Sequence, residues 1–202
     1  MASADVIVIS GGIGGAATAL GLVEEGAEKV FDFDEHLPSL RLSRGNLGLT
    51  WFMCKGTNNS VYAEWCRMAT EQWPQFAARL EKKTGYHLEL EWTRGAIQAF
   101  GEKQYNTYAT SIESLKVVCT EVGLNYPVRM LCRKEFTELL PDIQVGEDVT
   151  GIMCKVDQGH VNPKKLLDAV RWAFQQKGGH YYGAHSVTAI VPETCGANGK
   201  NQ

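Results

Sequence analysis

The chain has 202 residues, of which 44% are hydrophobic, and a formal net charge of -3 at pH 7. This length is enough for one large domain or two small ones with a buried core. The weak charge gives no electrostatic reason to bind nucleic acid or an anionic membrane, and no segment is long and apolar enough to predict a transmembrane helix. We therefore expect a globular protein without nucleic-acid partners or membrane spans.

The cysteine and histidine patterns argue against a metal site. The six cysteines include no C-x-x-C pair, so neither zinc ligands nor a disulfide framework is encoded. The five histidines show no ligand spacing either. Because reduced thiols are typical of the cytoplasm, we predict a cytoplasmic protein with no bound metal.

The opening of the chain predicts a strand, a helix and a second strand. The β-branched run over Asp5–Ser10 is typical of a strand buried on both faces of a parallel sheet. Good helix formers follow over Ala16–Glu25, with Gly26 placed to end the helix. Residues Lys29–Asp34 are then predicted to form a second strand. This order is that of a right-handed βαβ unit.

A glycine-rich turn joins the first strand to the helix. The run Ser10–Gly15 occupies the frame of the dinucleotide fingerprint G-x-G-x-x-G, with Ser10 in place of the first glycine and Gly11 beside it expected to absorb the unusual dihedrals. The two later glycines would let the backbone approach a pyrophosphate and let the helix pack against the strand. Asp34 ends the second strand, where a carboxylate can bind an adenosine ribose. The pattern favours dinucleotide binding, but it does not separate FAD from NAD, because both present the same ADP half.

Patterns along the rest of the chain predict further helices and strands. In chain order, we expect helical spacing over 60–83, strands over His87–Trp92 and Ala96–Phe100, helices over Glu102–Val122 and Arg133–Leu140, a strand near Gly151–Cys154, a helix over Pro163–Gln176 and a strand near His185–Val191. Pro74 predicts either a kink in the first of these helices or the start of a second one.

Near its end, the chain again shows alternating strand and helix patterns like those at its start. This similarity predicts the domain organisation. We expect an α/β fold in which residues 1–84 and 147–202 form a Rossmann-like dinucleotide-binding domain, discontinuous and incomplete. Residues 85–146 would form a β-rich α+β insertion that is part of a substrate domain.

The segment after the second strand carries a resemblance to a known family. Residues Leu42–Trp51 read L-S-R-G-N-L-G-L-T-W and resemble the S-x-x-N-x-G loop of the D-amino-acid-oxidase-like (DAO) family of FAD-dependent amine oxidoreductases. The resemblance continues through Trp51–Gly56, Tyr62–Trp65, Asp157–Pro163 and the region around Val187. Within the family, the chain looks most like the flavin subunits of hydrogen cyanide synthase, opine oxidase and D-hydroxyproline dehydrogenase.

This resemblance implies a cofactor, a substrate class and partners. It implies FAD, a small amino-acid or amine substrate whose hydride passes to the flavin, and heteromeric electron-accepting subunits as partners. Carried over by position, the cofactor-binding residues would be Ser10, Gly12, Ile13, Gly14, Gly15, Asp34, Glu35, Leu42, Ser43, Asn46, Leu47, Gly48, Leu49 and Val187. Without the resemblance, the leucines and the valine in this set could equally be ordinary core, and the serine and asparagine at 43 and 46 could be turn residues.

Two features depart from the family pattern. Family members are longer than this chain, and the part without a counterpart here carries most substrate contacts, so we nominate no catalytic residue. An alternative function is therefore a truncated, non-catalytic fragment or scaffold subunit with weak or no FAD binding. Asp32 lies on the same face of the second strand as Val30, where burial without a partner is costly and predicts a raised pKa.

Overall fold

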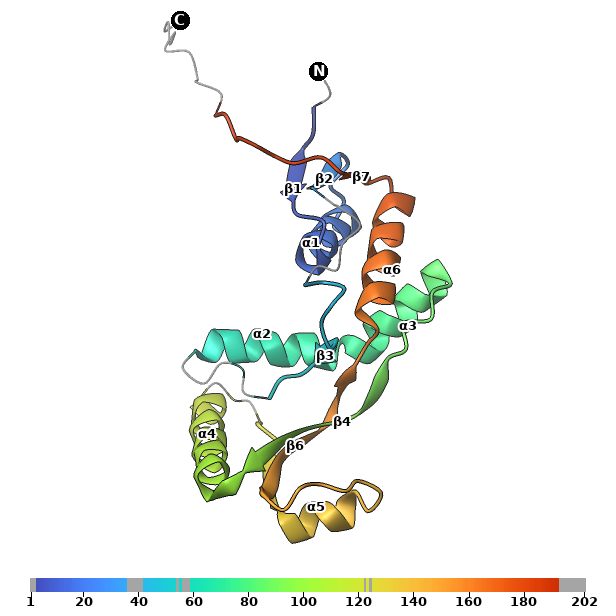
Figure 1. Ribbon diagram of the computed structural model, residues 1–202. Helices are drawn as coiled ribbons and strands as arrows, with labels where there is room; N and C mark the ends of the chain where they lie inside the picture. Colours follow the sequence, from blue (N-terminus) through green and yellow to red (C-terminus); the bar gives the residue numbers. More distant parts are fainter. Residues whose placement is uncertain are drawn as a thin grey trace, which may run out of the picture. The chain divides into compact units, whose positions relative to one another are not determined.

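The computed structural model describes residues 3–35, 42–53, 55, 59–121, 123 and 125–192. Its elements (Figure 1) are β1 (Val6–Ile9), α1 (Ile13–Glu24), β2 (Val30–Asp34), β3 (Leu49–Thr50), α2 (Ser60–Glu71), α3 (Trp73–Thr84), β4 (Glu91–Phe100), α4 (Gly101–Glu121), β5 (Arg129–Cys132), α5 (Arg133–Leu139), β6 (Val149–His160), α6 (Pro163–Gln176) and β7 (His180–Gly183). The chain divides into a first unit, Met1–Gly45 with Leu167–Gln202, and a second unit, Asn46–Leu166.

The first unit is built on a parallel sheet in the order β1-β2-β7. Val8 of β1 pairs with Asp32 of β2, and Asp32 pairs with Tyr181 of β7. Helix α1 contacts both β1 and β2, and small residues on its buried side let it lie close to the sheet. Gly26 follows α1 with a φ of 97°, a conformation that favours glycine after a helix. The predicted strand, helix and strand, and the α/β fold class, are confirmed.

The third strand of this sheet lies earlier in the chain than predicted. We expected a strand near His185–Val191, whereas β7 is His180–Gly183 and residues 184–192 form no strand. The reason is the tight end of α6: Gly178 has a φ of 90°, and a Cβ at Gly179 would overlap the ring of Phe174. The two glycines therefore turn the chain directly into the position beside β2.

The second unit contains an antiparallel sheet centred on β6. Strand β6 pairs with β4 along most of its length and with β3 and β5 on its other side. The sequence placed residues 147–160 with the dinucleotide-binding sheet, but β6 extends over twelve residues and pairs only with strands of the second unit among the described residues. Helices α2 and α3 also belong to this unit. The borders of the compact units thus differ from those of the predicted domains, because the antiparallel pairing of β6 holds these segments together.

Two local details of the second unit decide alternatives left open by the sequence. Pro74 lies in the first turn of α3, so it begins a second helix and does not kink a single one. The predicted strand over His87–Trp92 does not form before Glu91. Glu89 has a φ of 56°, which interrupts an extended chain.

The core of the second unit lies on both faces of β6. Because neighbouring strand residues point to opposite faces, Met153 packs with Phe52 and Leu115 in one hydrophobic cluster, whereas Ile152 packs with Phe136 in another. This alternation explains why β6 is almost continuously apolar from Val149 to Cys154, as in a strand covered on both faces.

Candidate dinucleotide site

The glycine turn places the start of α1 at the end of β1. Gly12 is the N-cap of α1 and, as a glycine, has no side chain with which to cap the helix. A Cβ at Gly15 would overlap the carbonyl oxygen of Ser10, so glycine is required where the helix approaches the strand. A Cβ at Gly14 would meet none of the described residues within 4 Å. The first turn of α1 thus offers N–H groups that have no partner within the helix, with open space beside Gly14, which fits a pyrophosphate.

Ser10, the departure from the glycine fingerprint, adopts the unusual dihedral itself. Its φ is 102°, whereas Gly11 has no positive φ, so the expectation that Gly11 would absorb the strain is wrong. Gly11 is needed for another reason: a Cβ there would lie 2.7 Å from the ring of Tyr181. Such a φ at a non-glycine residue costs on the order of 1–3 kcal/mol and is kept only where the surrounding structure enforces it. Here the Ser10 N–H donates to the carbonyl of Phe33 at 2.8 Å.

Ser43 lies against the same turn. Its Oγ accepts a hydrogen bond from the N–H of Ile13 at 2.9 Å, and a Cβ at Gly12 would lie 2.9 Å from that oxygen. The neighbouring Arg44 forms an ion pair with Asp168 of α6, with 3.7 Å between Nη2 and Oδ1. The structure therefore brings predicted residues from the glycine turn and from the segment after β2 together at the N terminus of α1.

Asp34, the predicted ribose ligand, lies at the end of β2 in a network that the sequence did not predict. Its Oδ2 accepts hydrogen bonds from Arg171 Nη2 at 2.7 Å and from the Tyr181 hydroxyl at 3.2 Å. The guanidinium carbon of Arg171 lies 4.5 Å from the centre of the Tyr181 ring. Burial is the main cause that raises the pKa of Tyr181. The carboxylate is thus held in a fixed orientation by the buried Arg171 and the half-buried Tyr181.

One sequence signal points to Arg171. This residue follows Leu167 by four positions and precedes Phe174 by three, so it lies on the buried face of an amphipathic helix. An arginine on such a face needs an anionic partner. The pattern does not say which acid that partner is, because Asp34 lies 137 residues away in the chain.

Asp32 lies two residues before Asp34 on the same buried face of β2. Its side chain is fully buried, and both carboxyl oxygens lack a hydrogen-bond partner among the described residues. Burial raises the pKa of Asp32 to about 6, although the positive charge of Arg171 opposes this and the negative charge of Asp34 adds to it. The raised pKa predicted from the strand pattern is therefore confirmed.

The remaining predicted cofactor residues fall into two groups, of which the first is exposed to solvent. Leu42, Leu47 and Leu49 are exposed, by 91%, 78% and 48%, so they are not ordinary core. Glu35 and Val187 are also exposed.

The second group, Asn46 and Gly48, has local structural roles in the second unit. Asn46 Oδ1 accepts from the Gly48 N–H at 2.6 Å, as in a turn. Gly48 has a φ of 65°, and a Cβ there would overlap the carbonyl oxygen of Val161.

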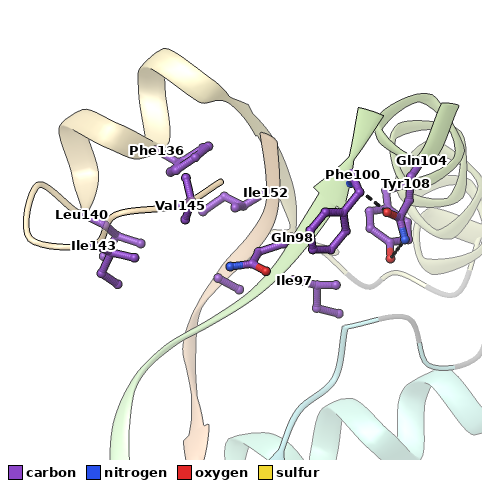
Figure 2. Close-up of a pocket in the computed structure, with 11 residues that line it drawn as sticks. Ile97, Gln98, Phe100, Gln104, Tyr108, Phe136, Leu140, Ile143, Val145 and Ile152 are labelled. Atoms are coloured by element: carbon purple, nitrogen blue, oxygen red, sulfur yellow. Dashed lines mark hydrogen bonds between the residues drawn. The ribbon is translucent and has the colours of Figure 1, made fainter. Parts of the chain in front are cut away.

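The second unit contains a separate pocket of about 550 Å³. Figure 2 shows Phe136, Val145 and Ile152 on one side of it, and Phe100 with Tyr108 on the other. Gln104 links these last two residues, accepting from the Phe100 N–H and donating to the Tyr108 hydroxyl, both at 2.8 Å. None of the described residues that line the pocket is charged, so it offers no ion pair to a substrate carboxylate.

Two further observations concern metal ions and membranes. Within the described ranges, no group of three or more His, Cys, Asp or Glu side chains is arranged to hold a metal ion. No helix formed by those residues is long and apolar enough to cross a membrane.

Comparison with known proteins assigns the family. Residues 5–201 match the family DAO, described as FAD dependent oxidoreductase. A subunit of opine oxidase from Rhizobium meliloti is 32% identical over 198 residues, which are 97% of this chain and 52% of that protein. The chain therefore spans about half the length of this relative.

Solved structures share the fold at lower identity. Glycine oxidase from Bacillus cereus ATCC 14579 superposes with a TM-score of 0.75 at 24% identity, covering 95% of this chain and 49% of that one. L-α-glycerophosphate oxidase from Mycoplasma pneumoniae, solved with FAD bound, gives a TM-score of 0.69 at 20% identity and covers 93% and 46%. The chain belongs to the DAO family of FAD-dependent oxidoreductases, the cofactor of which is FAD.

Proposed function

We propose that this chain is the cofactor-binding part of an FAD-dependent dehydrogenase or oxidase acting on an amino acid or another amine. The observation that carries the proposal is the arrangement in the first unit, where the N terminus of α1, with open space beside Gly14, accompanies the carboxylate of Asp34 at the end of β2. Similarity to the opine oxidase subunit, and the fold shared with glycine oxidase, support the amine substrate class.

Several of the predicted residues have distinct roles in the proposed binding of the cofactor. The N terminus of α1 would bind the pyrophosphate, and the Asp34 carboxylate would accept hydrogen bonds from the adenosine ribose. Ser43 would fix the first turn of α1 through its bond to Ile13. The remaining proposed cofactor-lining residues are Ser10, Gly12, Gly14, Gly15, Glu35, Leu42, Asn46, Leu47, Gly48, Leu49 and Val187.

The proposed reaction is a two-electron oxidation that converts a carbon–nitrogen single bond into an imine. When bound, FAD supplies an acceptor for a hydride. The substrate would lose that hydride from the carbon next to its nitrogen and a proton from the nitrogen, and water would then hydrolyse the imine. Electrons would leave to oxygen or to a partner protein, and the second route is supported by the Rhizobium meliloti relative, which is one subunit of its oxidase.

A second candidate function is a non-catalytic fragment or scaffold that binds FAD weakly or not at all. It is supported by the pocket of the second unit, whose described lining residues carry no charge that could bind a substrate carboxylate. For either function we propose a cytoplasmic location, which the free thiols of Cys66, Cys119, Cys132 and Cys154 support.

Titration of the purified chain with FAD separates the two candidates. We expect flavin fluorescence to be quenched at near-stoichiometric FAD for the wild type. Gly12→Val should abolish this, because its branched side chain would crowd Ser43 Oγ and occupy the phosphate path. Gly21→Ala, on the same helix and facing open space, is the matched control and should bind FAD as the wild type does. Absence of quenching in the wild type would favour the scaffold.

A further inference from the structure

Arg171 connects the two parts of the first unit that would hold the ADP half of the cofactor. From α6, its Nε donates to the carbonyl oxygen of Gly11 at 3.0 Å and its Nη2 donates to the same oxygen. The Nη2 group also donates to Asp34 Oδ2 at 2.7 Å. Gly11 belongs to the turn before α1, and Asp34 ends β2, so one side chain bridges turn and strand.

We propose that Arg171 is a positioning residue for the ADP half of the cofactor, fixing the glycine turn and the Asp34 carboxylate in one geometry. The inference rests on the proposed function, because it assigns a role within the same site. Arg171 is not among the cofactor-binding residues predicted from the sequence. It lies 160 residues after Gly11 in the chain.

The first argument concerns the direction of the peptide groups. The peptide bonds of the described residues are all trans, so the N–H of Gly12 points opposite to the carbonyl of Gly11. By holding that carbonyl with two donors, Arg171 also fixes the direction of the Gly12 N–H. This N–H is one of the groups that a helix N terminus offers to a phosphate.

The second argument concerns the shape of the side chain. A guanidinium presents several donors in one rigid plane, so it can serve two acceptors at a set separation, whereas a lysine ammonium acts as a point charge. The plane is supported by the Tyr181 ring at 4.5 Å. Gly11 leaves no room for adjustment, because even a Cβ would lie 3.1 Å from Arg171 Nη2.

The third argument concerns charge. Arg171 is buried, as are the two carboxylic residues Asp32 and Asp34, and the half-buried Tyr181 also bonds to Asp34. Without the guanidinium, the two carboxyl groups on one buried face of β2 would repel each other without the opposing charge of Arg171. Arg171 therefore both orients Asp34 and balances its charge, and an experiment must separate the two effects.

The experiment measures dissociation constants for FAD and for ADP as separate probes, on protein whose far-UV circular dichroism shows that it is folded. Arg171→Gln should raise both constants by the same factor, about tenfold or more, which corresponds to the loss of one charge-assisted contact. Arg171→Lys keeps the charge without the fork and should give an intermediate value. Lys177→Gln removes an exposed positive charge just after α6 and should change neither constant.

A double variant separates positioning from charge balance. Asp32→Asn with Arg171→Gln leaves the same net charge in the cluster as in the wild type, and it relieves the repulsion that could prevent the single variant from folding. Weak binding of both probes by this double variant supports positioning. If the double variant recovers the wild-type constants, the positioning role is overturned in favour of charge balance. Unchanged constants in folded Arg171→Lys and Arg171→Gln proteins would also overturn the positioning role. If the wild type binds neither probe, the proposed function itself fails.

Discussion

The carbonyl oxygen of Ser10 occupies the place that a Cβ atom at Gly15 would need. This relationship sets how closely α1 approaches the end of β1. The obstacle is backbone, so it cannot move aside as a flexible side chain could. The third glycine of the fingerprint is thus explained by packing inside the protein, independently of any ligand.

Gly15→Ala is expected to destabilise the protein. Overpacking against a rigid neighbour typically costs about 1–3 kcal/mol. Gly14→Ala is the matched control, because its Cβ meets nothing within 4 Å, and it should instead raise the free energy of unfolding by about 0.5–1 kcal/mol through helix propensity. Urea unfolding of the two variants checks this. Equal stabilities would show that the helix can shift away from the strand.

Gly48 offers a second test, in the second unit. It has a φ of 65°, and a Cβ would overlap the carbonyl oxygen of Val161, whose N–H donates to the Gly48 carbonyl at 3.0 Å. Gly48→Ala should therefore lower the free energy of unfolding by more than Gly85→Ala. Gly85 has a similar φ of 72° but faces open space, so its substitution should cost only the conformational term of about 1–2 kcal/mol. A Gly48→Ala protein no less stable than Gly85→Ala would contradict the steric explanation.

The sequence predicted those elements whose signals are local. The boundaries of α6 were predicted correctly, because Pro163 begins the helix and Gly178 follows its end. The strand β7 was misplaced because its sequence, H-Y-Y-G, is less typical of a buried strand than the β-branched run around Val187. Which run pairs with β2 is decided by how tightly the chain leaves α6, and the propensity of single residues does not contain that information.

In the candidate site, too, features with local sequence signals are predictable and features that depend on tertiary packing are not. The glycine turn and Asp34 are predictable because their spacing follows from the βαβ geometry. The partners Arg171 and Tyr181 are not, since they reach Asp34 only after α6 and β7 have packed against β2. A buried charge on Asp32 indicates that a cation is needed nearby, but distance along the chain hides which residue supplies it.

Asn162 provides a test of how α6 begins. Its Oδ1 accepts from the Lys165 N–H at 3.1 Å, which is the geometry of a helix N-cap, and its Nδ2 donates to Glu89 Oε2 at 2.7 Å. Asn162→Ala should lower the free energy of unfolding by about 1 kcal/mol. Asn162→Ser keeps a capping oxygen and should recover part of this loss in thermal or urea unfolding. Equal losses in both variants would show that the contact with Glu89, and not the cap, is what matters.

Asp32→Val is expected to stabilise the protein at neutral pH. The carboxyl group is fully buried without a hydrogen bond to any residue that the structure describes, and its pKa is raised from the ordinary value of 3.8 to about 6. The attraction between Arg171 and the Asp32 carboxylate is therefore too weak to offset the cost of burial. In the variant, Arg171 still forms its ion pair with Asp34. The difference between the two pKa values corresponds to about 3 kcal/mol against folding above pH 6. Urea unfolding at pH 7 should show a gain on the order of 1–3 kcal/mol.

The pH dependence identifies the cause of this gain. Because the folded pKa of Asp32 is raised, the wild type is penalised least below pH 3.8, where the carboxyl group is protonated in both states, and the penalty grows as the pH rises towards 6. The advantage of Asp32→Val over the wild type should therefore increase between pH 4 and about 6.5 and then level off. Asp142→Val makes the same substitution at an exposed position and should show no such increase. An advantage that does not change with pH would attribute the gain to apolar packing alone. A less stable Asp32→Val protein would mean that the attraction of Arg171 for the Asp32 carboxylate outweighs the cost of burial.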